Sequence, residues 1–207
     1  MSRLLKVTDI KVHFPIGKAG FFGRPTAYVR AVDGVSFEIQ RGETLGLVGE
    51  SGSGKTTLGR AVLRALEPTS GQIVYEHNDS SVDIMGLDRN GLRAMWRHMQ
   101  MIFQDPYSSL NPRMTVRDVI GEPLIANKMD KGSGLNDRVV DMAQRCGLNV
   151  GHLSRFPHAF SGGQRQRIAI ARALILHPEF IVCDEAVSAL DVSIQAQILN
   201  LLTDLQV

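Results

Sequence analysis

The sequence predicts an α/β fold built around a phosphate-binding loop. Residues 49–56 read Gly-Glu-Ser-Gly-Ser-Gly-Lys-Thr, which matches the pattern G-x-x-x-x-G-K-[ST]. An apolar run at 44–48 precedes the loop and a helical pattern at 57–63 follows it, so we expect a buried strand, a glycine loop and a helix in that order. A second apolar run at 180–183 ends in an acid pair, as strands of a parallel sheet do at a ligand crevice.

The residue types in the loop suit a phosphate chain with its metal ion. Glycines let the backbone turn so that several N–H groups face one anion, and the N-terminus of the following helix adds partial positive charge. We expect Lys55 to reach the β- and γ-phosphates and the Thr56 hydroxyl to coordinate Mg²⁺. Asp184 would hold the same ion through water, and Glu185 would polarise the attacking water.

Composition limits the other classes of function. The 207 residues suit one domain, and 43% hydrophobic with 21% charged residues is typical of a globular protein. A net charge of +2 gives no argument for nucleic-acid binding. The two cysteines are far apart and favour a reducing compartment. No apolar run approaches 18 residues, so we expect a soluble, cytosolic chain that meets a membrane only through a partner.

Periodicity predicts the elements of the first half of the chain. Alternating apolar residues indicate a strand over 3–14 and another at 71–75. Residues 28–39 suggest two strands joined by a turn at Asp33-Gly34, which is a hairpin signal. The polar residues 78–86 are interpreted as surface, 91–98 as helical, and 99–103 as a short buried strand.

The second half is predicted to be mostly helical from about 105 to 160. A helix over 115–126 would begin at Thr115 as its N-cap, although Gly121 and Pro123 interrupt it. Residues 135, 139, 142 and 146 fall on one helical face. Further helices are expected at 165–176 and 194–205. We expect Cys183 to be buried and inert, and the arginines at 165 and 167 to form a solvated or interface face.

Five motifs in order identify a family. The glycine loop is followed by Gln104, by Ser161-Gly162-Gly163-Gln164, by the acid pair, and by Ser188-Ala189-Leu190-Asp191. Over nearly its whole length the chain resembles the ATP-binding subunits of ABC transporters, with Phe160 where leucine is commoner before the signature. The resemblance implies a P-loop NTPase core with an antiparallel β subdomain and an inserted helical subdomain, all in one nucleotide-binding domain over 1–207.

A narrower resemblance points to one branch of that family. Residues 103–106 and 109–113, Phe-Gln-Asp-Pro and Ser-Leu-Asn-Pro-Arg, are similar to oligopeptide/dipeptide importers, and most of all to their F-type ATPase subunit. The resemblance implies ATP hydrolysis that powers import of peptides, although nickel and glutathione importers share these patterns. It further implies a second ATPase subunit in a head-to-tail dimer, two membrane-spanning permeases, an extracytoplasmic solute-binding protein acting indirectly, and no nucleic acid. The location implied is the cytoplasmic face of a bacterial or archaeal membrane.

The resemblance also assigns the site. Gln104 would join the Mg²⁺ shell, and Tyr28 would stack on adenine unless it is a sheet aromatic packed in the core. Ser161 and the N–H groups after it would form a second anion site that faces the γ-phosphate bound by the other subunit. The residues expected to contact ATP are Tyr28, Gly49, Glu50, Ser51, Gly52, Ser53, Gly54, Lys55, Thr56, Thr57, Ser161, Gly162, Gly163, Gln164 and Asp191.

One expected group is missing from the sequence. The family places a switch histidine beyond the last helix, and no histidine follows His177 in this chain. We therefore expect a C-terminally truncated chain that binds ATP and hydrolyses it poorly.

Other functions stay open on the sequence. Asp83 to Gly86 has the form D-x-x-G and Asn127 to Asp130 the form N-K-x-D, which together suggest a GTPase. Asp83 follows a polar run rather than a predicted strand, and a GTPase would leave the signature unexplained. A non-transport ABC ATPase of DNA repair or translation, or a nucleotide-binding module without catalysis, is a further alternative.

Overall fold

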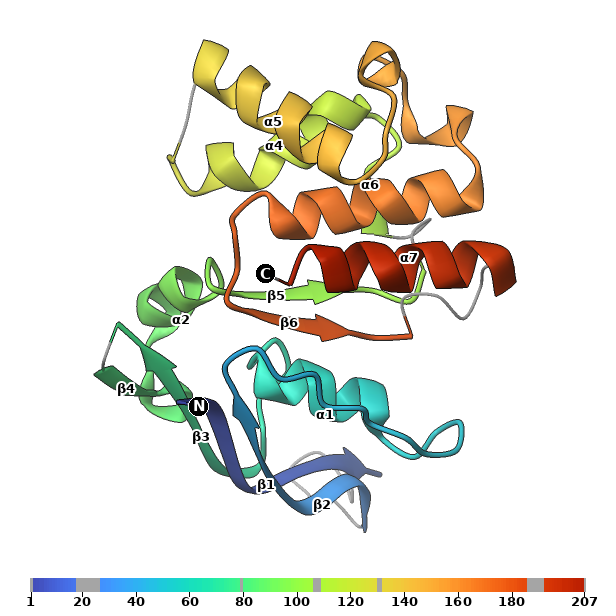
Figure 1. The fold of residues 1–207 in the computed structure, drawn as a ribbon. Coiled ribbons are helices and arrows are strands. Elements are labelled where there is room, and N and C mark those ends of the chain that lie inside the picture. Colours follow the sequence, from blue (N-terminus) through green and yellow to red (C-terminus); the bar gives the residue numbers. More distant parts are fainter. Residues whose placement is uncertain are drawn as a thin grey trace. The chain divides into compact units, whose positions relative to one another are not determined.

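The computed structural model describes residues 2–17, 27–78, 80–105, 109–129, 132–185 and 192–206. The chain divides into two compact units, residues 1–94 and 95–207 (Figure 1). Among the described residues, no helix combines the length and apolarity needed to cross a membrane. The predicted α/β class is confirmed, because an antiparallel sheet, a parallel strand pair and helices are all present.

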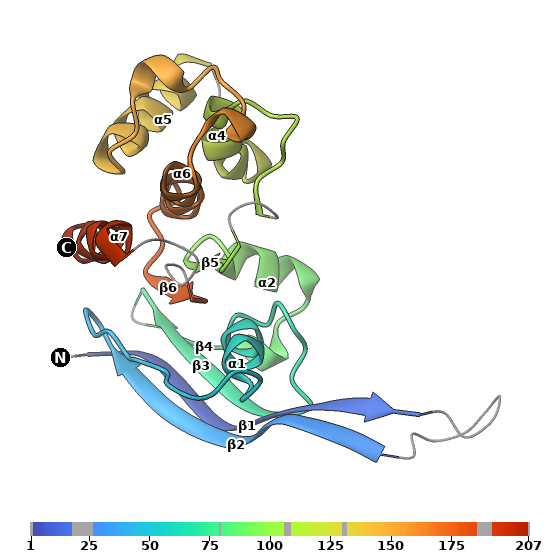
Figure 2. The same cartoon turned by 90° about the vertical axis from the view of Figure 1, so that its right-hand side faces the viewer.

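The first unit is an antiparallel sheet with one helix packed against it. Its strands are β1 (Arg3–Ile16), β2 (Ala27–Gln40), β3 (Ser70–His77) and β4 (Ser80–Asp83), in the order β2-β1-β3-β4. The predicted strands at 3–14 and 71–75 are confirmed. Helix α1 (Lys55–Val62) lies over the curved sheet in Figure 2 and buries Leu58, Ala61 and Val62. The sheet contributes Leu5, Val7, Ile10, Val12, Ile73 and Tyr75 to the core.

The predicted hairpin turn at Asp33-Gly34 is wrong, because β2 is one continuous strand. Asp33 pairs with Lys11 and Val35 pairs with Ile10, so Gly34 is an extra residue that the partner strand does not match. Gly34 has φ +83°, a left-handed conformation that occurs in β-bulges and that glycine adopts without steric cost. An Asp-Gly pair supplies positive φ equally well to a turn or to a bulge, and the long partner strand β1 decides between them.

The interpretation of residues 78–86 as surface is confirmed for most of the residues that the structure describes there, although Ile84 is buried. These residues contain β4 and the 3₁₀ turn η1 (Ile84–Gly86). Strand β4 is short and lies at the edge of the sheet, where polar residues are tolerated because little of the strand is buried. Asp83 is therefore the last residue of a strand, and its carboxylate accepts a hydrogen bond from the N–H of Met85 as the cap of η1.

The second unit is built on two parallel strands with helices packed on one another. Strands β5 (Met99–Ile102) and β6 (Phe180–Cys183) confirm the two strands predicted here, and the structure pairs them in parallel from Met99–Phe180 to Ile102–Cys183. The helices are α4 (Val116–Ala126), α5 (Ser133–Arg145), α6 (Gly162–Leu174) and α7 (Val192–Asp204), with 3₁₀ turns η2 (Val150–His152) and η3 (Pro157–Ala159). Helix α2 (Arg89–Met95) precedes β5.

Helix α4 shows how local sequence and packing combine in this unit. Thr115 caps it, because its hydroxyl accepts a hydrogen bond from the N–H of Asp118. Gly121 and Pro123 do not break it. A Cβ at Gly121 would lie 3.3 Å from side chains of Leu135 and Val139, so glycine permits the close approach of α5. The predicted face of α5 is confirmed, because Val139 and Met142 are buried and Leu135 packs against the same core.

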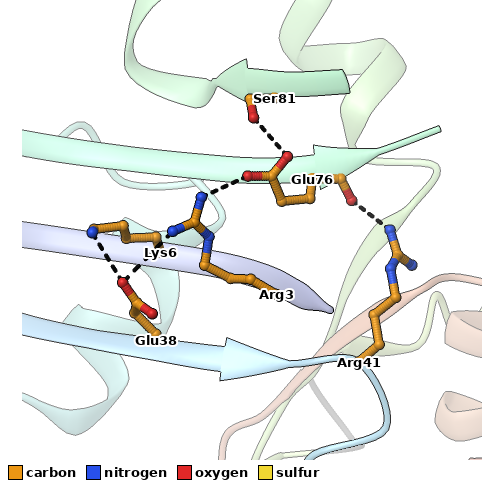
Figure 3. A network of polar contacts seen from close by, with 6 residues as sticks. All are labelled: Arg3, Lys6, Glu38, Arg41, Glu76 and Ser81. Carbon is orange, nitrogen blue, oxygen red and sulfur yellow. Dashed lines mark hydrogen bonds and ion pairs between the residues drawn. The ribbon is translucent and has the colours of Figure 1, made fainter. Parts of the chain in front are cut away.

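A polar network ties the four strands of the first unit together (Figure 3). Arg3 donates to Glu76 at 2.8 Å, Ser81 donates to the same carboxylate at 2.6 Å, and Arg41 donates to the Glu76 carbonyl at 2.7 Å. Glu38 on β2 lies 3.0 Å from the Lys6 ammonium and 3.8 Å from the Arg3 guanidinium. The Arg3 hydrogen bond, followed by that from Ser81, holds the pKa of Glu76 below its ordinary value of 4.5.

The network makes the stability of the first unit depend on pH in a defined direction. The pKa of Glu38 is also lowered, first by its hydrogen bond from Lys6. A carboxylate with a lower pKa in the folded state stabilises that state above the pKa of the unfolded chain. This contribution is lost as the pH falls through 4.5 and below.

We predict that Glu76→Gln lowers stability at pH 7 and that its difference from wild type shrinks below pH 4.5, because the carboxylate of the wild type then loses its charge. Urea midpoints at pH 7 and at about pH 3.5 measure this difference. Ser81→Ala, which removes one of the two side-chain hydrogen bonds to the Glu76 carboxylate, should show the same trend at smaller amplitude. A difference between Glu76→Gln and wild type that is equal at both pH values would contradict the assignment.

Candidate nucleotide-binding site

The glycine loop lies in the first unit, and Lys55 folds back over its start. The Lys55 ammonium donates to the carbonyls of Gly49 and Glu50, each at 2.8 Å. The N–H of Ser53 closes a turn onto Glu50 at 3.1 Å, and α1 begins directly after Gly54. The lysine cation and the first N–H groups of α1 therefore lie at the same short segment of chain, which is what a phosphate-binding loop requires.

The glycines of the loop are required by its close contacts. Gly54 has φ +94°, and a Cβ there would lie 2.1 Å from the carbonyl oxygen of Ala31 on β2. A Cβ on Gly49 would lie 2.6 Å from the Ser53 hydroxyl, and Gly52 has φ +80°. The last glycine of the loop, Gly54, therefore lies directly against β2, and the first, Gly49, lies against the Ser53 side chain of the loop itself. Thr56 and Thr57 follow in the half-buried first turn of α1.

The strand expected before the loop is absent. Residues 43–50 form no strand, and Leu47 and Val48 are 52% and 94% exposed. A strand needs neighbours for its backbone hydrogen bonds, and among the described residues neither sheet includes this segment. The apolar pattern at 44–48 indicates a preference for burial without specifying which strand the segment pairs with.

Tyr28 lies on β2, opposite Pro15 of β1, and is 56% exposed. The alternative that it is a sheet aromatic packed in the core is therefore wrong. Its exposed ring is open to stacking, and the role in binding adenine stays a prediction.

The acid pair and Gln104 lie together in the second unit. The N–H of Asp184 donates to the Ile102 carbonyl at 2.9 Å, which continues the β5–β6 ladder and leaves Asp184 only 8% exposed. Glu185 follows in a left-handed conformation with φ +46°. Its carboxylate accepts a hydrogen bond at 2.8 Å from the Gln104 side-chain amide, 81 residues away in sequence. The two predicted catalytic side chains are therefore neighbours.

Two other predictions near these acids have different outcomes. Cys183 is exposed rather than buried, although the surrounding protein atoms desolvate its thiol and raise its pKa to about 11. The thiol therefore stays protonated at neutral pH, in agreement with the predicted inertness. Asp191 and the motif Ser188–Asp191 lie outside the described residues.

Helix α6 begins at the signature sequence. Ser161 is its N-cap: the Ser161 hydroxyl accepts from the Gln164 N–H at 3.3 Å, and the Gln164 side chain accepts from the Ser161 N–H at 3.0 Å. A Cβ on Gly163 would lie 2.9 Å from Ile194, so glycine lets α7 approach this turn. Phe160, which replaces the commoner leucine, is buried in the core of the unit. Ser161 itself is exposed.

Arg165 and Arg167 are half-buried and bind neighbouring backbone, so the prediction of a solvated face is wrong and that of an interface face stays a prediction. Arg165 donates to the carbonyls of Pro157 at 2.9 Å and His158 at 3.2 Å. Arg167 donates to the Cys146 carbonyl at 3.0 Å and to Gln197 of α7 at 3.1 Å. Sequence reasoning missed these roles because a backbone carbonyl as partner leaves no side-chain signal in the sequence.

The donor groups fit ATP with Mg²⁺. The loop offers a cation and N–H groups to phosphate, and the Thr56 hydroxyl, the Asp184 carboxylate and the Gln104 amide offer the oxygen ligands that Mg²⁺ prefers. The loop is positioned by the first unit and the acid pair with Gln104 by the second, and the residue types of these groups are those of a P-loop nucleotide-binding protein.

Comparison with known proteins gives the family. The model of the ABC transporter family matches residues 32–188, and the chain belongs to this family. It is 50% identical over 204 residues to the oligopeptide transport ATP-binding protein AppF of Bacillus subtilis, covering 98% of this chain and 60% of AppF. It is 51% identical over 203 residues to the glutathione import ATP-binding protein GsiA of Shigella boydii, covering 98% of this chain and 32% of GsiA.

A solved structure agrees with this assignment. The dimeric ATP-binding cassette MJ0796, bound to ADP and Pi after hydrolysis, superposes with a TM-score of 0.82 at 27% identity, over 98% of this chain and 83% of that one. The predicted fold, with a P-loop NTPase core of the ABC-ATPase type, is confirmed. The chain spans 60% of AppF and 64% of the oligopeptide transport ATP-binding protein OppF of Bacillus subtilis.

We predict that Gly54→Ala lowers ATP affinity by more than about 100-fold, because its methyl group would displace the loop from Ala31. Fluorescent ATP titration measures this effect. The matched control is Gly42→Ala, since Gly42 also has positive φ, at +74°, but nothing lies within 4 Å of its Cβ position. The control should cost about 1–3 kcal/mol of stability and leave ATP affinity unchanged. Wild-type affinity in Gly54→Ala would contradict the role of this contact.

Proposed function

We propose that the chain binds ATP with Mg²⁺ and hydrolyses it as the ATPase subunit of an ABC importer of peptides or a related small solute. The hydrogen bond between Gln104 and Glu185 carries the hydrolytic part of the proposal, because it gathers two predicted catalytic side chains beside the buried Asp184. The peptide part rests on the relatives, which include the oligopeptide transport protein AppF and the glutathione import protein GsiA. The choice between these solutes belongs to the rest of the transporter.

Each group has a distinct chemical task in this proposal. Lys55 and the N–H groups at the start of α1 bind the phosphate chain and offset its negative charge. Thr56 of the first unit, and Asp184 and Gln104 of the second, would offer oxygen ligands to Mg²⁺, and the ion would supply positive charge to offset that of the phosphates. Glu185 orients the attacking water and accepts its proton. The Gln104 amide fixes the direction of the Glu185 carboxylate.

The signature segment implies a second protomer. The N-terminus of α6 presents the Ser161 hydroxyl and unpaired helix N–H groups, which suit the γ-phosphate held by another chain. The dimeric cassette MJ0796 supports this arrangement. We propose a head-to-tail dimer of ATPase subunits that acts from the cytoplasmic face of the membrane on two permease subunits. A solute-binding protein would deliver the cargo from outside.

We predict that Glu185→Gln retains ATP binding and loses turnover by at least about 100-fold, because an amide cannot accept the proton of the attacking water. Lys55→Ala should instead lose binding, since the phosphates lose their cation. ATP titration and phosphate release separate the two effects, and GTP serves as the competing nucleotide. Equal turnover in Glu185→Gln and wild type would contradict the catalytic role.

A second prediction concerns Ser161. Ser161→Asp keeps an N-cap residue but adds a negative charge facing the γ-phosphate, so ATP-dependent dimerisation should weaken by more than about 100-fold. Ser161→Asn also keeps the cap and stays neutral, so it should dimerise much like wild type. Sedimentation with and without ATP gives the readout. Equal behaviour of the Asp and Asn variants would exclude Ser161 from a phosphate site.

A further inference from the structure

An arginine lies near the N-terminus of α6, where a cation is unfavourable. The N-terminus of a helix carries partial positive charge, which repels a positive side chain placed in its first turns. Arg165 nevertheless comes four residues after the N-cap Ser161. Its backbone N–H donates to the Ser161 carbonyl at 2.9 Å, so the residue belongs to the first hydrogen-bonded turn of the helix. A cation at this place needs contacts that offset the repulsion.

The Arg165 side chain finds these contacts in the chain that leads into α6. Residues four apart lie on the same face of a helix, and long side chains lean toward its N-terminus, so the guanidinium reaches back past Ser161. Nε donates to the Pro157 carbonyl at 2.9 Å, and a terminal nitrogen donates to the His158 carbonyl at 3.2 Å. Both carbonyls belong to η3, the 3₁₀ turn directly before the signature segment.

The link between η3 and Ser161 is fixed by further contacts. The Phe160 N–H donates to the same Pro157 carbonyl at 3.1 Å, so this oxygen accepts from two donors. The Phe160 side chain is buried, and its ring lies edge-on to that of His152 with the centroids 6.3 Å apart. A guanidinium is planar, so two N–H groups aimed at two acceptors fix the orientation of the whole fork. These contacts together fix the direction from which the chain enters α6.

That direction decides where the first groups of α6 point. The Ser161 hydroxyl accepts from the Gln164 N–H, and the Gln164 side chain accepts from the Ser161 N–H. The N–H groups of Gly162 and Gly163 find no acceptor within the helix, because the first turn has no preceding carbonyls. These two N–H groups and the Ser161 hydroxyl are the donors that the proposed function assigns to the γ-phosphate.

We propose that Arg165 is a positioning residue that sets the angle at which Ser161 and the two glycine N–H groups meet the nucleotide of a second protomer. It acts through the carbonyls of η3 and through the short link to Ser161. The inference rests on the proposed function for its effect on dimerisation, whereas the contacts between Arg165 and η3 stand on the geometry alone.

The first experiment tests these contacts without nucleotide. In the full chain, Arg165→Gln should speed hydrogen exchange of the Phe160 and Ser161 amides by about tenfold, as expected when a charge-assisted hydrogen bond is lost. The matched control is Arg167→Gln. Arg167 is half-buried on the same helix and also binds two acceptors, neither of them in η3. Equal acceleration at the two amides in both variants would overturn the proposal.

The second experiment separates positioning from stability. Arg165→Gln should weaken ATP-dependent dimerisation by about tenfold and leave the chain's own ATP affinity, which depends on Lys55, within about twofold of wild type. Arg165→Lys keeps the cation and loses the planar fork, so it should recover only part of the dimerisation. Arg167→Gln should lower Tm and dimerise like wild type. Sedimentation with and without ATP, together with ATP titration, gives both readouts.

Two outcomes of the second experiment count against the positioning role. Dimerisation of Arg165→Gln equal to wild type would overturn it, and so would full recovery in Arg165→Lys, because charge alone would then explain the effect. A wild-type chain that binds no ATP, or does not dimerise with it, refutes the proposed function instead. In that case the exchange of the Phe160 and Ser161 amides alone supports or overturns the role of Arg165 at the entry to α6.

Discussion

The close approach of Gly54 to the carbonyl of Ala31 is the contact on which the nucleotide loop depends. It presses the end of the loop onto β2, so the antiparallel sheet fixes where α1 begins and where its N–H groups point. Two further features shape the surroundings of this contact. The bulge at Gly34 alters the course of β2. The hydrogen bond from Lys55 to the Gly49 carbonyl closes the loop. The first unit therefore works as a support for a single anion-binding turn.

The second unit is organised by one short parallel pair. The ladder from Met99 to Cys183 ends with the bond from Asp184 to Ile102, which directs Asp184 and Glu185 away from the strand end toward Gln104. Helix α6 is the other fixed element, because Ser161 caps its start and arginines bind it to the surrounding segments. The acid pair and Ser161 thus belong to the same unit, and the roles proposed for them depend on one set of packed elements.

The sequence predicted most elements because their apolar periodicity matched the burial that the fold gives them. The parallel pair, α4 with its Thr115 cap and α6 with its Ser161 cap are examples. It failed where a pattern leaves the partner unspecified. Gly34 suits either a turn or a bulge, so the sequence did not decide between them. The apolar residues 44–48 predict burial but do not specify a neighbouring strand. Arg165 binds backbone carbonyls, which every residue has and which leave no signal in the sequence. The family resemblance gave Gln104 and Glu185 separate roles at the nucleotide, and only the structure shows the direct hydrogen bond between their side chains.

In the proposed dimer, ATP is held by Lys55 of one protomer and Ser161 of another. The most direct measurement is ATP turnover by an equal mixture of Lys55→Ala and Ser161→Asp chains, each inactive alone. A mixed dimer contains one intact pair, so random pairing should restore about one quarter of the wild-type rate. If the mixture is no more active than its two components measured separately, the site is not shared between protomers and the account is wrong.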